Sequence, residues 1–399
     1  MTTSADNIGP PRTSVGVLGW LRKNLFSNWY NSLLTIVVSI VLYMVLSQLI
    51  VWVFTTARWA VIGANWRLFM VGPYPPDQVR RVFVILAMVA GLFGVSASVW
   101  GGTIRTFAIS LAAAFATFAV LPISAFDGEG RFWMIGYVLL VIAGYLIARG
   151  RKAWTRNLLI LWLLSFIVTV LLLQGFQNND WLPEVSTGRW GGLLLTFMLA
   201  IVSTVISFPL GVLLALGRRS NLPAVKLFSI FYIEVVRGVP LVTILYMTQI
   251  MLPLFLPGEF RIDNVVRAIA GMTFFTAAYM AENVRGGLQA IPGGQIEAAS
   301  ALGLNNILTT LFIVLPQALR MVIPATVGLF ISLFKDTTLV TIVALLELLG
   351  VGRSVLAQPE FLGLQTEVYA FVAAIFFVFS YAMSYASYQL EKALGVGKR

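Results

Sequence analysis

One charged motif, E-x-x-R-G, occurs twice in this otherwise apolar chain. It reads EVVRG at 234–238 and ENVRG at 282–286. Residues three apart on a helix lie on the same face, and charges near lipid are costly unless they are paired or turned inward. The spacing therefore predicts two local ion pairs that stabilise a helix bundle, in preference to direct contact with a substrate. The expected pairs are Glu234 with Arg237 and Glu282 with Arg285.

The residue types that most often do chemistry are missing. The chain has no His and no Cys, which excludes thiolate and imidazole metal sites, thiol and imidazole nucleophiles, and haem ligation by either group. The acids are scattered, so a membrane-embedded enzyme is a weak alternative. Gly397 and Lys398 lack the upstream glycine and the following Ser or Thr of a phosphate-binding loop. We therefore expect no catalytic residue, no metal and no nucleotide site on this chain.

The elements that carry the charged motifs are expected to lie in a membrane. Of the 399 residues, 59% are hydrophobic and 11% are charged, and the net charge is +11, whereas soluble domains have about 25% charged residues. A spanning helix needs about 20 apolar residues, so the length allows roughly ten spans and no large soluble domain. The cations stand in short clusters between apolar runs, which is the positive-inside pattern of a multi-pass protein. Nucleic-acid binding is not expected, because the continuous basic groove that it needs is missing.

Ten apolar runs predict an all-α protein that crosses the membrane about ten times. They lie at 33–54, 82–100, 103–121, 132–148, 157–173, 193–216, 228–256, 265–284, 311–333 and 366–388. The basic segments 149–156, 217–226 and 392–399 belong in the cytoplasm. The more acidic loops 122–131 and 174–191 face outward. This alternation places both termini in the cytoplasm.

The outer loop 174–191 divides the chain into two halves. We expect four parts: a polar cytoplasmic or interfacial tail over 1–32, a transmembrane extension of about five helices over 33–190, a core over 191–391, and a basic cytoplasmic tail over 392–399. The first 32 residues contain no apolar run and are not expected to be a cleaved signal.

Two segments do not fit this simple alternation. The segment 55–81 is placed outside although it is basic, so either it folds back on the outer surface or a span within 82–121 is miscounted. The expected position of such an error is Gly101–Gly102. The apolar run 337–350 is too short to span and is expected to form a re-entrant or interfacial helix.

A semi-polar stretch, IEAASALGLNN at 296–306, lies between apolar runs, and loop alternation places it in the cytoplasm. The Pro-Gly-Gly sequence at 292–294 ends the preceding helix, and residues 295–302 are rich in strong helix formers. Gly303 can adopt the left-handed conformation that stops this helix before a second one begins. Glu297 lies in the first turn, where the helix dipole favours an acid. These arguments leave open whether the helix–turn–helix is a docking element or an ordinary cytoplasmic loop.

The stretch resembles the EAA signature of permease subunits of binding-protein-dependent ABC importers. E-A-A, three residues, G, nine residues and I-x-L-P match 297–299, Gly303 and 313–316 without a gap. In that family the short helix, 295–304 in this chain, is a coupling helix seated in a cleft of the cytoplasmic ATPase. The resemblance implies that Glu297 meets a cation there and that Gly303 sets the angle between the two helices. The coupling residues implied are Glu297, Ala298, Ala299, Gly303 and Leu304. Ala298, Ala299 and Ala301 are small enough to let another backbone come close.

Neighbouring islands resemble the polar-amino-acid branch of these permeases. The islands are 232–242, 277–295, 315–325 and 332–340. Segment 25–35 is similar to the general L-amino-acid permeases, whose subunits carry an N-terminal extension. The resemblance implies a five-helix type I ABC importer core, behind that extension, in a bacterial inner (plasma) membrane. The implied partners are an ABC ATPase homodimer that binds ATP-Mg, a second homologous permease and a periplasmic amino-acid-binding protein, while this chain itself binds no cofactor.

An amino acid in transit needs donors for its carboxylate and acceptors for its ammonium group, near the middle of the membrane and between the subunits. The candidates by depth are Thr243, Gln249, Thr273, Thr276 and Tyr279. For each of them a helix–helix hydrogen bond is the simpler interpretation.

Lys335 and Asp336, at the expected outer end of the helix over 311–333, could gate the entrance, dock a binding protein, or only neutralise each other. An ion-coupled secondary transporter stays open as an alternative function. It would need intramembrane ion-coupling groups and usually inverted repeats, whereas the two E-x-x-R-G motifs run in parallel.

Overall fold

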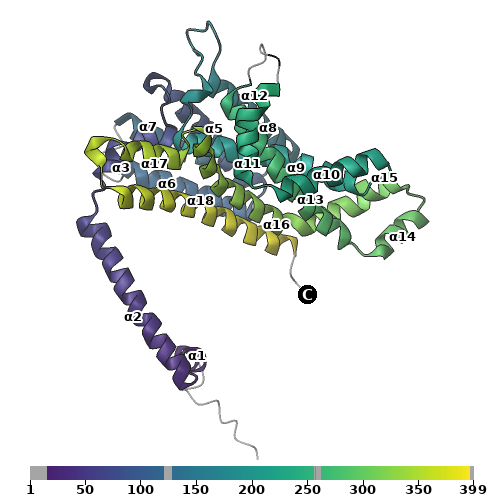
Figure 1. Cartoon of the computed structure of the whole chain (residues 1–399), viewed down its shortest axis with the longest axis horizontal. Coiled ribbons are helices and arrows are strands. Elements are labelled where there is room, and N and C mark those ends of the chain that lie inside the picture. The colour runs from purple at the N-terminus through teal and green to yellow at the C-terminus, as the bar shows by residue number, and fades with distance from the viewer. Residues whose placement is uncertain (1–15, 121–127, 256, 258–261, 396–399) are drawn as a thin grey trace, which may run out of the picture. The chain divides into compact units, whose positions relative to one another are not determined.

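The computed structural model describes residues 16–120, 128–255, 257 and 262–395, and their regular structure is helical (Figure 1). The all-α fold class is therefore confirmed. The contacts divide the chain into two compact units, Met1–Trp59 and Ala60–Arg399. Most of the predicted outer loop 122–131, and the end of the basic tail, lie outside the described residues.

The first unit contains one long apolar helix. Its elements are α1 (Gly16–Asn24), α2 (Trp29–Val51) and a π-helical continuation, η1 (Trp52–Thr56). Asn28 caps α2 by accepting a hydrogen bond from Asn31 N, and Thr35 Oγ1 donates to Leu25 O, which ties α2 to the end of α1. No side chain of α2 is buried, and its apolar run is long enough to cross a membrane.

Within the described residues, eight helical segments are long and apolar enough to cross a membrane, and nine if one bent pair is a single span. The eight are Trp29–Thr56, Pro76–Val99, Gly102–Val120, Gly128–Ile147, Thr155–Gln174, Gly192–Arg218, Asn306–Val343 and Gln365–Ala393, and the bent pair is Pro223–Gly238 with Leu241–Phe255. Each coincides with one of the expected runs. The tenth run, 265–284, lies in α13 (Asn264–Gln289), which has 26 residues but is less apolar because it carries Thr, Glu and Arg side chains.

The N-terminal part of the second unit is a bundle around α5. Its elements are α3 (Ala60–Ala64), α4 (Trp66–Val71), η2 (Pro76–Gln78), α5 (Arg80–Val99), α6 (Gly102–Val120), α7 (Gly128–Ile147), η3 (Lys152–Trp154) and α8 (Thr155–Gln174). A Cβ on Gly94 of α5 would lie 2.2 Å from Val141 O of α7, so these two helices meet backbone to backbone, as small residues allow in membranes. Gly101 and Gly102 separate α5 from α6. The region 82–121 therefore holds two helices, as expected.

The rest of the second unit is built around α13. The surrounding elements are η4 (Thr187–Arg189), α9 (Gly192–Arg218), α10 (Pro223–Gly238), α11 (Leu241–Tyr246), η5 (Met247–Met251), α12 (Leu252–Phe255), α16 (Leu315–Asp336) and α18 (Gln365–Leu394). α13 packs against α9, α16 and α10, and Ala268, Met272 and Ala281 on it have no exposed surface. The helix pair bends by 108° between Gly238 and Leu241, because Pro240 lacks the N–H that would continue α10.

Two segments leave the pattern of long helices. The first contains α14 (Gly293–Ala301), α15 (Asn306–Leu308) and a π-helical turn, η6 (Thr309–Val314), which runs into α16; the second contains η7 (Thr337–Val343), α17 (Leu348–Leu356) and η8 (Pro359–Phe361). Figure 1 shows α14 and α15 beyond the ends of α13 and α16. In the second segment the chain turns at Ala344, whose φ is 62°, and α17 is too short to span.

The basic segment 55–81 folds back onto the second unit from residue 60 onward. α3 packs against α18, and α4 packs against α9 and α17. Phe69 of α4 has no exposed surface and shares an apolar cluster with Val351 and Val355 of α17. Of the two explanations considered for its charge, folding back agrees with the structure, because both helices of 82–121 are present.

Candidate functional site

The helix α14 ends in a Schellman motif. Gly303 N donates to Ser300 O at 3.0 Å, and Leu304 N donates to Ala299 O at 3.1 Å. This pair of bonds needs a left-handed residue at the turn, and Gly303 has a φ of +80°. Asn305 then caps the next helix through its side chain. The sequence thus folds residues 292–308 into a two-helix projection, called the elbow below.

The elbow presents one acid and several apolar side chains on its surface. Glu297 and Ala298 are exposed, and Leu302 retains 82% of its surface. Ala299, in contrast, is 3% exposed, because α14 packs on η6. Ala299 is therefore not free to meet another backbone, contrary to the expectation, whereas Ala298 and Ala301 are exposed and such a contact at them stays a prediction.

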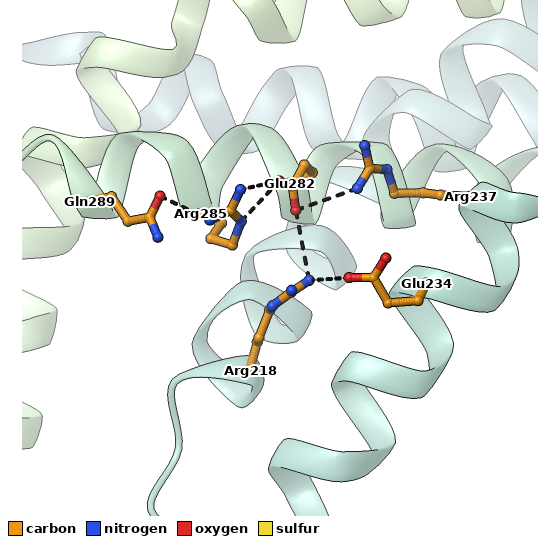
Figure 2. Close-up of polar contacts among 6 residues, drawn as sticks. All are labelled: Arg218, Glu234, Arg237, Glu282, Arg285 and Gln289. Carbon is orange, nitrogen blue, oxygen red and sulfur yellow. Dashed lines mark hydrogen bonds and ion pairs between the residues drawn. The ribbon is translucent and has the colours of Figure 1, made fainter.

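Charged side chains from α9, α10 and α13 gather around Glu282 (Figure 2). Glu282 Oε1 accepts hydrogen bonds from Nε and Nη2 of Arg285. Glu282 Oε2 lies 3.6 Å from Arg237 Nη1 and 3.8 Å from Arg218 Nη1. Arg218 Nη1 also donates to Glu234 Oε1 at 2.8 Å. We call these five residues the Glu282 cluster.

The Glu282 cluster differs from the two local pairs that the motif predicts. Glu282 and Arg285 form the expected pair within one helix. Among the ion pairs of the described residues, however, none joins Glu234 to Arg237: each pairs with a residue of another helix. The physical reason is that α10 packs against both α9 and α13, so its two charged side chains reach oppositely charged groups on both neighbours. The motif thus connects three helices.

The Glu282 cluster continues toward the elbow along α13. Arg285 Nη1 donates to Gln289 Oε1 at 2.9 Å (Figure 2). Gln289 is the last residue of α13 and comes three positions before Pro292, which precedes α14. Arg219, at the end of α9, donates to Leu288 O at 3.3 Å. The elbow therefore directly follows the end of α13, where side chains hold α9 to α13.

Arg237 is the least satisfied cation of the Glu282 cluster. Its guanidinium lies 5.5 Å from the centre of the Tyr279 ring, a cation–π contact. Its Nε is buried without a hydrogen-bond partner. Tyr279, a candidate for substrate contact, is thus half-buried beside this arginine.

The remaining substrate candidates are not gathered by the structure into one polar surface. Gln249 is 8% exposed, and its Nε2 donates to Asn264 O at 2.5 Å. Thr273 and Thr276 are 3% and 1% exposed, covered by the helices that pack on α13. Thr243 alone of these four is exposed. The interpretation as a helix–helix hydrogen bond therefore fits Gln249, whereas Thr273 Oγ1 is buried without a hydrogen-bond partner.

Lys335 and Asp336 form the end of α16. Lys335 is exposed and Asp336 is half-buried. No ion pair found among the described residues joins them, so mutual neutralisation by direct contact is not observed.

Two residues with well-defined partners, Arg218 and Glu347, are not indicated by the sequence motifs. Arg218 lies in the basic segment 217–226, which the charge pattern indicates only as a cytoplasmic loop; its place at the end of one helix, with Glu234 in the next, is the signal for the pair. Glu347 was not singled out: it is fully buried and caps α17 by accepting hydrogen bonds from Leu349 N and Gly350 N, both at 2.8 Å. Thr341 Oγ1 donates to the same carboxylate at 2.7 Å. Burial raises the pKa of Glu347 above its ordinary value.

Several helices long enough to cross a membrane, and a surface elbow that carries an EAA motif, indicate a membrane permease. Residues 207–395 match the family of binding-protein-dependent transport system inner membrane components. The chain is 38% identical to the inner membrane amino-acid ABC transporter permease protein YhdY of Escherichia coli K12, over 98% of this chain and 97% of that protein. This chain belongs to that family, in its branch of amino-acid ABC transporter permeases.

Two further permeases agree with this placement. The glutamate/glutamine/aspartate/asparagine transport system permease protein BztC of Rhodobacter capsulatus is 36% identical over 96% of this chain and 95% of its own length. The probable glutamine ABC transporter permease protein GlnP of Bacillus subtilis is 34% identical over 51% of this chain and 91% of its own. A crystal structure of an amino acid ABC transporter with histidines is 28% identical, covers 51% of this chain and 92% of that one, and has a TM-score of 0.46. The ion-coupled secondary transporter, considered from the sequence, is not supported.

Proposed function

We propose that this chain is the transmembrane subunit of an ATP-driven amino-acid importer and that the elbow couples it to a cytoplasmic ATPase. The observation that carries the proposal is the elbow itself: an EAA motif folded as an exposed short helix, stopped by a left-handed Gly303, in a chain similar over its whole length to amino-acid ABC transporter permeases. Amino acids are the proposed cargo because the relatives' names specify them.

Some of the coupling residues lie on the exposed surface of the elbow, and the others set its direction or support it from inside. Glu297, Ala298 and the exposed Leu302 lie on the surface that would enter a cleft of the ATPase. Gly303 and Leu304 set the direction of α14 through the Schellman bonds. An exposed acid in an apolar surface pairs well with a cation in a partially desolvated interface. Ala299 supports the elbow from inside.

The energy source and the remaining subunits belong to the same proposal. ATP-Mg would bind to an ATPase homodimer below the membrane, a second homologous permease would complete the pathway, and a periplasmic amino-acid-binding protein would deliver the substrate. In this arrangement the elbow and both termini face the cytoplasm. Residues 191–391 serve as the permease core, 33–190 as its transmembrane extension, and 1–32 and 392–399 as cytoplasmic tails.

The Glu282 cluster has a place in this mechanism. It joins α9, α10 and α13 at the end nearest the elbow, so a push on the elbow moves the three helices as one body. Rigid-body movement of this kind is how many transporters alternate between inward-open and outward-open states. Lys335 and Asp336, at the end of α16, are proposed to gate the other end.

The experiment that tests the proposal is uptake by the reconstituted transporter. The chain is co-purified with its ATPase, second permease and binding protein and placed in liposomes, and uptake of labelled L-glutamine, L-glutamate and L-arginine is measured. We expect uptake of at least one of them that requires internal ATP and survives an ionophore. Uptake that persists without ATP and collapses with the ionophore would contradict the proposal, as would a chain that never co-purifies with an ATPase.

A further inference from the structure

Three stretches of backbone meet at the N-terminal end of α9. They are 72–73 after α4, 191–192 at the start of α9, and 346–347 before α17. A Cβ on Gly191 would lie 2.8 Å from Pro73 Cδ, 2.9 Å from Gly72 Cα and 2.9 Å from Leu346 O. Only a glycine fits at residue 191 without a shift of the neighbouring backbone. We call these three stretches the glycine junction.

Hydrogen bonds join α17 to α9 at the glycine junction. Gly192 N donates to Leu346 O at 2.8 Å, and Leu348 N donates to Thr196 Oγ1 at 3.2 Å. Thr196 and Glu347 have no exposed surface. If either bond broke, a buried donor or acceptor would be left without a partner, which is costly. The two bonds therefore hold the first turn of α17 against the first turn of α9.

Residues 60–74 complete the junction from the N-terminal half of the chain. Val61, Ile62 and Phe69 pack against α17 and α18 in one apolar cluster. Val71 and Tyr74 pack with Trp190 and the start of α9 in another. Tyr74 also donates a hydrogen bond to Leu173 O at 2.9 Å, which ties the segment to the end of α8.

The glycine junction and the Glu282 cluster lie at opposite ends of one helix. α9 runs from Gly192 to Arg218 as one helix of 27 residues that contains Pro209, and this length corresponds to about 40 Å. One end is held at the glycine junction, and the other end enters the Glu282 cluster beside the elbow. If the elbow is displaced while the glycine junction holds the N-terminal end of α9, the helix tilts about that end.

We propose that residues 60–74 position the transport core as its pivot: they hold the glycine junction so that displacement of the elbow becomes a tilt of α9 and of the helices joined to it. The inference rests on the proposed transport function. It gives the N-terminal half of the chain a mechanical role in transport, through residues distant from both the elbow and the Glu282 cluster.

A pivot and an ordinary packing contact differ in their effect on coupling. If the glycine junction only stabilises the fold, loosening it leaves fewer assembled transporters, and ATP hydrolysis and uptake fall by the same factor. If the glycine junction is the pivot, loosening it still lets the elbow move with the ATPase, but α9 is displaced without its full tilt. Hydrolysis then continues while uptake falls, so the number of amino acids imported per ATP decreases.

The test uses two glycines of the same loop in the full transporter in liposomes. Gly191→Ala places its Cβ against three backbone or ring atoms, whereas at Gly188 the nearest atom to such a Cβ is Ser186 Oγ at 3.7 Å. Uptake of the amino acid transported fastest among glutamine, glutamate and arginine is measured together with ATP hydrolysis in the same vesicles. We expect the uptake-to-hydrolysis ratio to fall several-fold in Gly191→Ala and to stay at the wild-type value in Gly188→Ala.

The proposal is overturned if the ratio in Gly191→Ala equals that of the wild type, whether both rates are normal or both fall together. Should Gly191→Ala fail to assemble, Thr196→Val is measured and interpreted in the same way, because it replaces with a methyl group the hydroxyl that accepts from Leu348 N and donates to Gly192 O. Wild-type liposomes that show no ATP-driven uptake would contradict the transport function itself, and an unchanged ratio alongside normal ATP-driven uptake would contradict only the pivot.

Discussion

Arg218 Nη1 and Glu234 Oε1 lie 2.8 Å apart, although the two residues belong to different helices. Their pair closes the turn between α9 and α10 at the end that also meets α13 through Glu282. The two acids of the Glu282 cluster are not equally exposed: the Glu282 side chain retains 23% of its surface and that of Glu234 retains 54%. Because water screens exposed pairs, the two acids contribute differently to the strength of the cluster.

The first prediction compares those two acids. Glu282→Gln leaves three arginines facing one remaining carboxylate, and we expect the free energy of unfolding to fall by about 1–3 kcal/mol, the range for removing one partner of a buried polar group. Glu234→Gln is expected to cost about 0–1 kcal/mol, as for an exposed pair. Thermal unfolding in detergent measures both. Equal losses, or the reverse order, would contradict the central position of Glu282.

The second prediction concerns the turn of the elbow. Gly303 has a φ of +80°, and a Cβ there meets nothing within 4 Å, so Gly303→Asp strains the backbone by roughly 1–2 kcal/mol without a clash. We expect the variant to reach the membrane but to lose uptake. Gly395→Asp is the control, since Gly395 also has a positive φ, +68°, and open space around it but lies far along the chain from the elbow. Normal uptake by Gly303→Asp would be evidence against coupling through α14.

The third prediction uses the two adjacent alanines of α14, one exposed and one buried. Ala298→Leu adds bulk on the surface, so we expect normal thermal stability of the isolated chain but weaker co-purification with the ATPase. Ala299→Leu forces bulk into the contact between α14 and η6, and we expect it to lower stability by about 1–3 kcal/mol. Pull-down and thermal unfolding separate the two effects. An ATPase that binds Ala298→Leu as well as wild type would place the docking face elsewhere.

Much of this fold follows from the apolar pattern of the sequence. Each expected run coincides with a helical segment, and 228–256 coincides with a bent pair of helices, since the backbone groups of an apolar stretch must be satisfied within the segment in lipid. The elbow follows from Pro292 and Gly303, whose backbone preferences are local. The α10–α11 bend likewise follows from Pro240, which cannot donate the next helical hydrogen bond.

The contacts between distant residues could not be obtained in this way. Helical spacing suggests that Glu234 pairs with Arg237. In the structure Glu234 pairs with Arg218 and Arg237 pairs with Glu282, because three helices converge there. Spacing within one helix carries no information about its neighbours. Ala299 turned inward for a similar reason. The fold-back of residues 60–74 onto α17 depends on apolar packing between segments almost 300 positions apart, for which the basic charge of 55–81 gave only an indirect signal.

The buried carboxylate of Glu347 allows a prediction about pH. It lies between η7 and α17, outside the long apolar helices, in the segment that joins α17 to α9. Burial raises its pKa, and the hydrogen bonds from Leu349 N, Thr341 and Gly350 N offset this only in part. The folded chain therefore holds a proton on Glu347 more tightly than the unfolded chain does.

The sign of the effect on stability follows from linkage. A raised pKa contributes stability that is fully present below the unfolded value of 4.5 and is lost as the pH rises through the folded pKa. Glu347→Gln has no such dependence, so we expect the wild type to lose stability relative to this variant as the pH is raised from about 4 to about 7. Thermal unfolding of both proteins at each pH gives the difference, and Glu360→Gln, an exposed acid on η8, should follow the wild type. A difference that stays constant, or that changes in favour of the wild type as the pH rises, would contradict a raised pKa at Glu347.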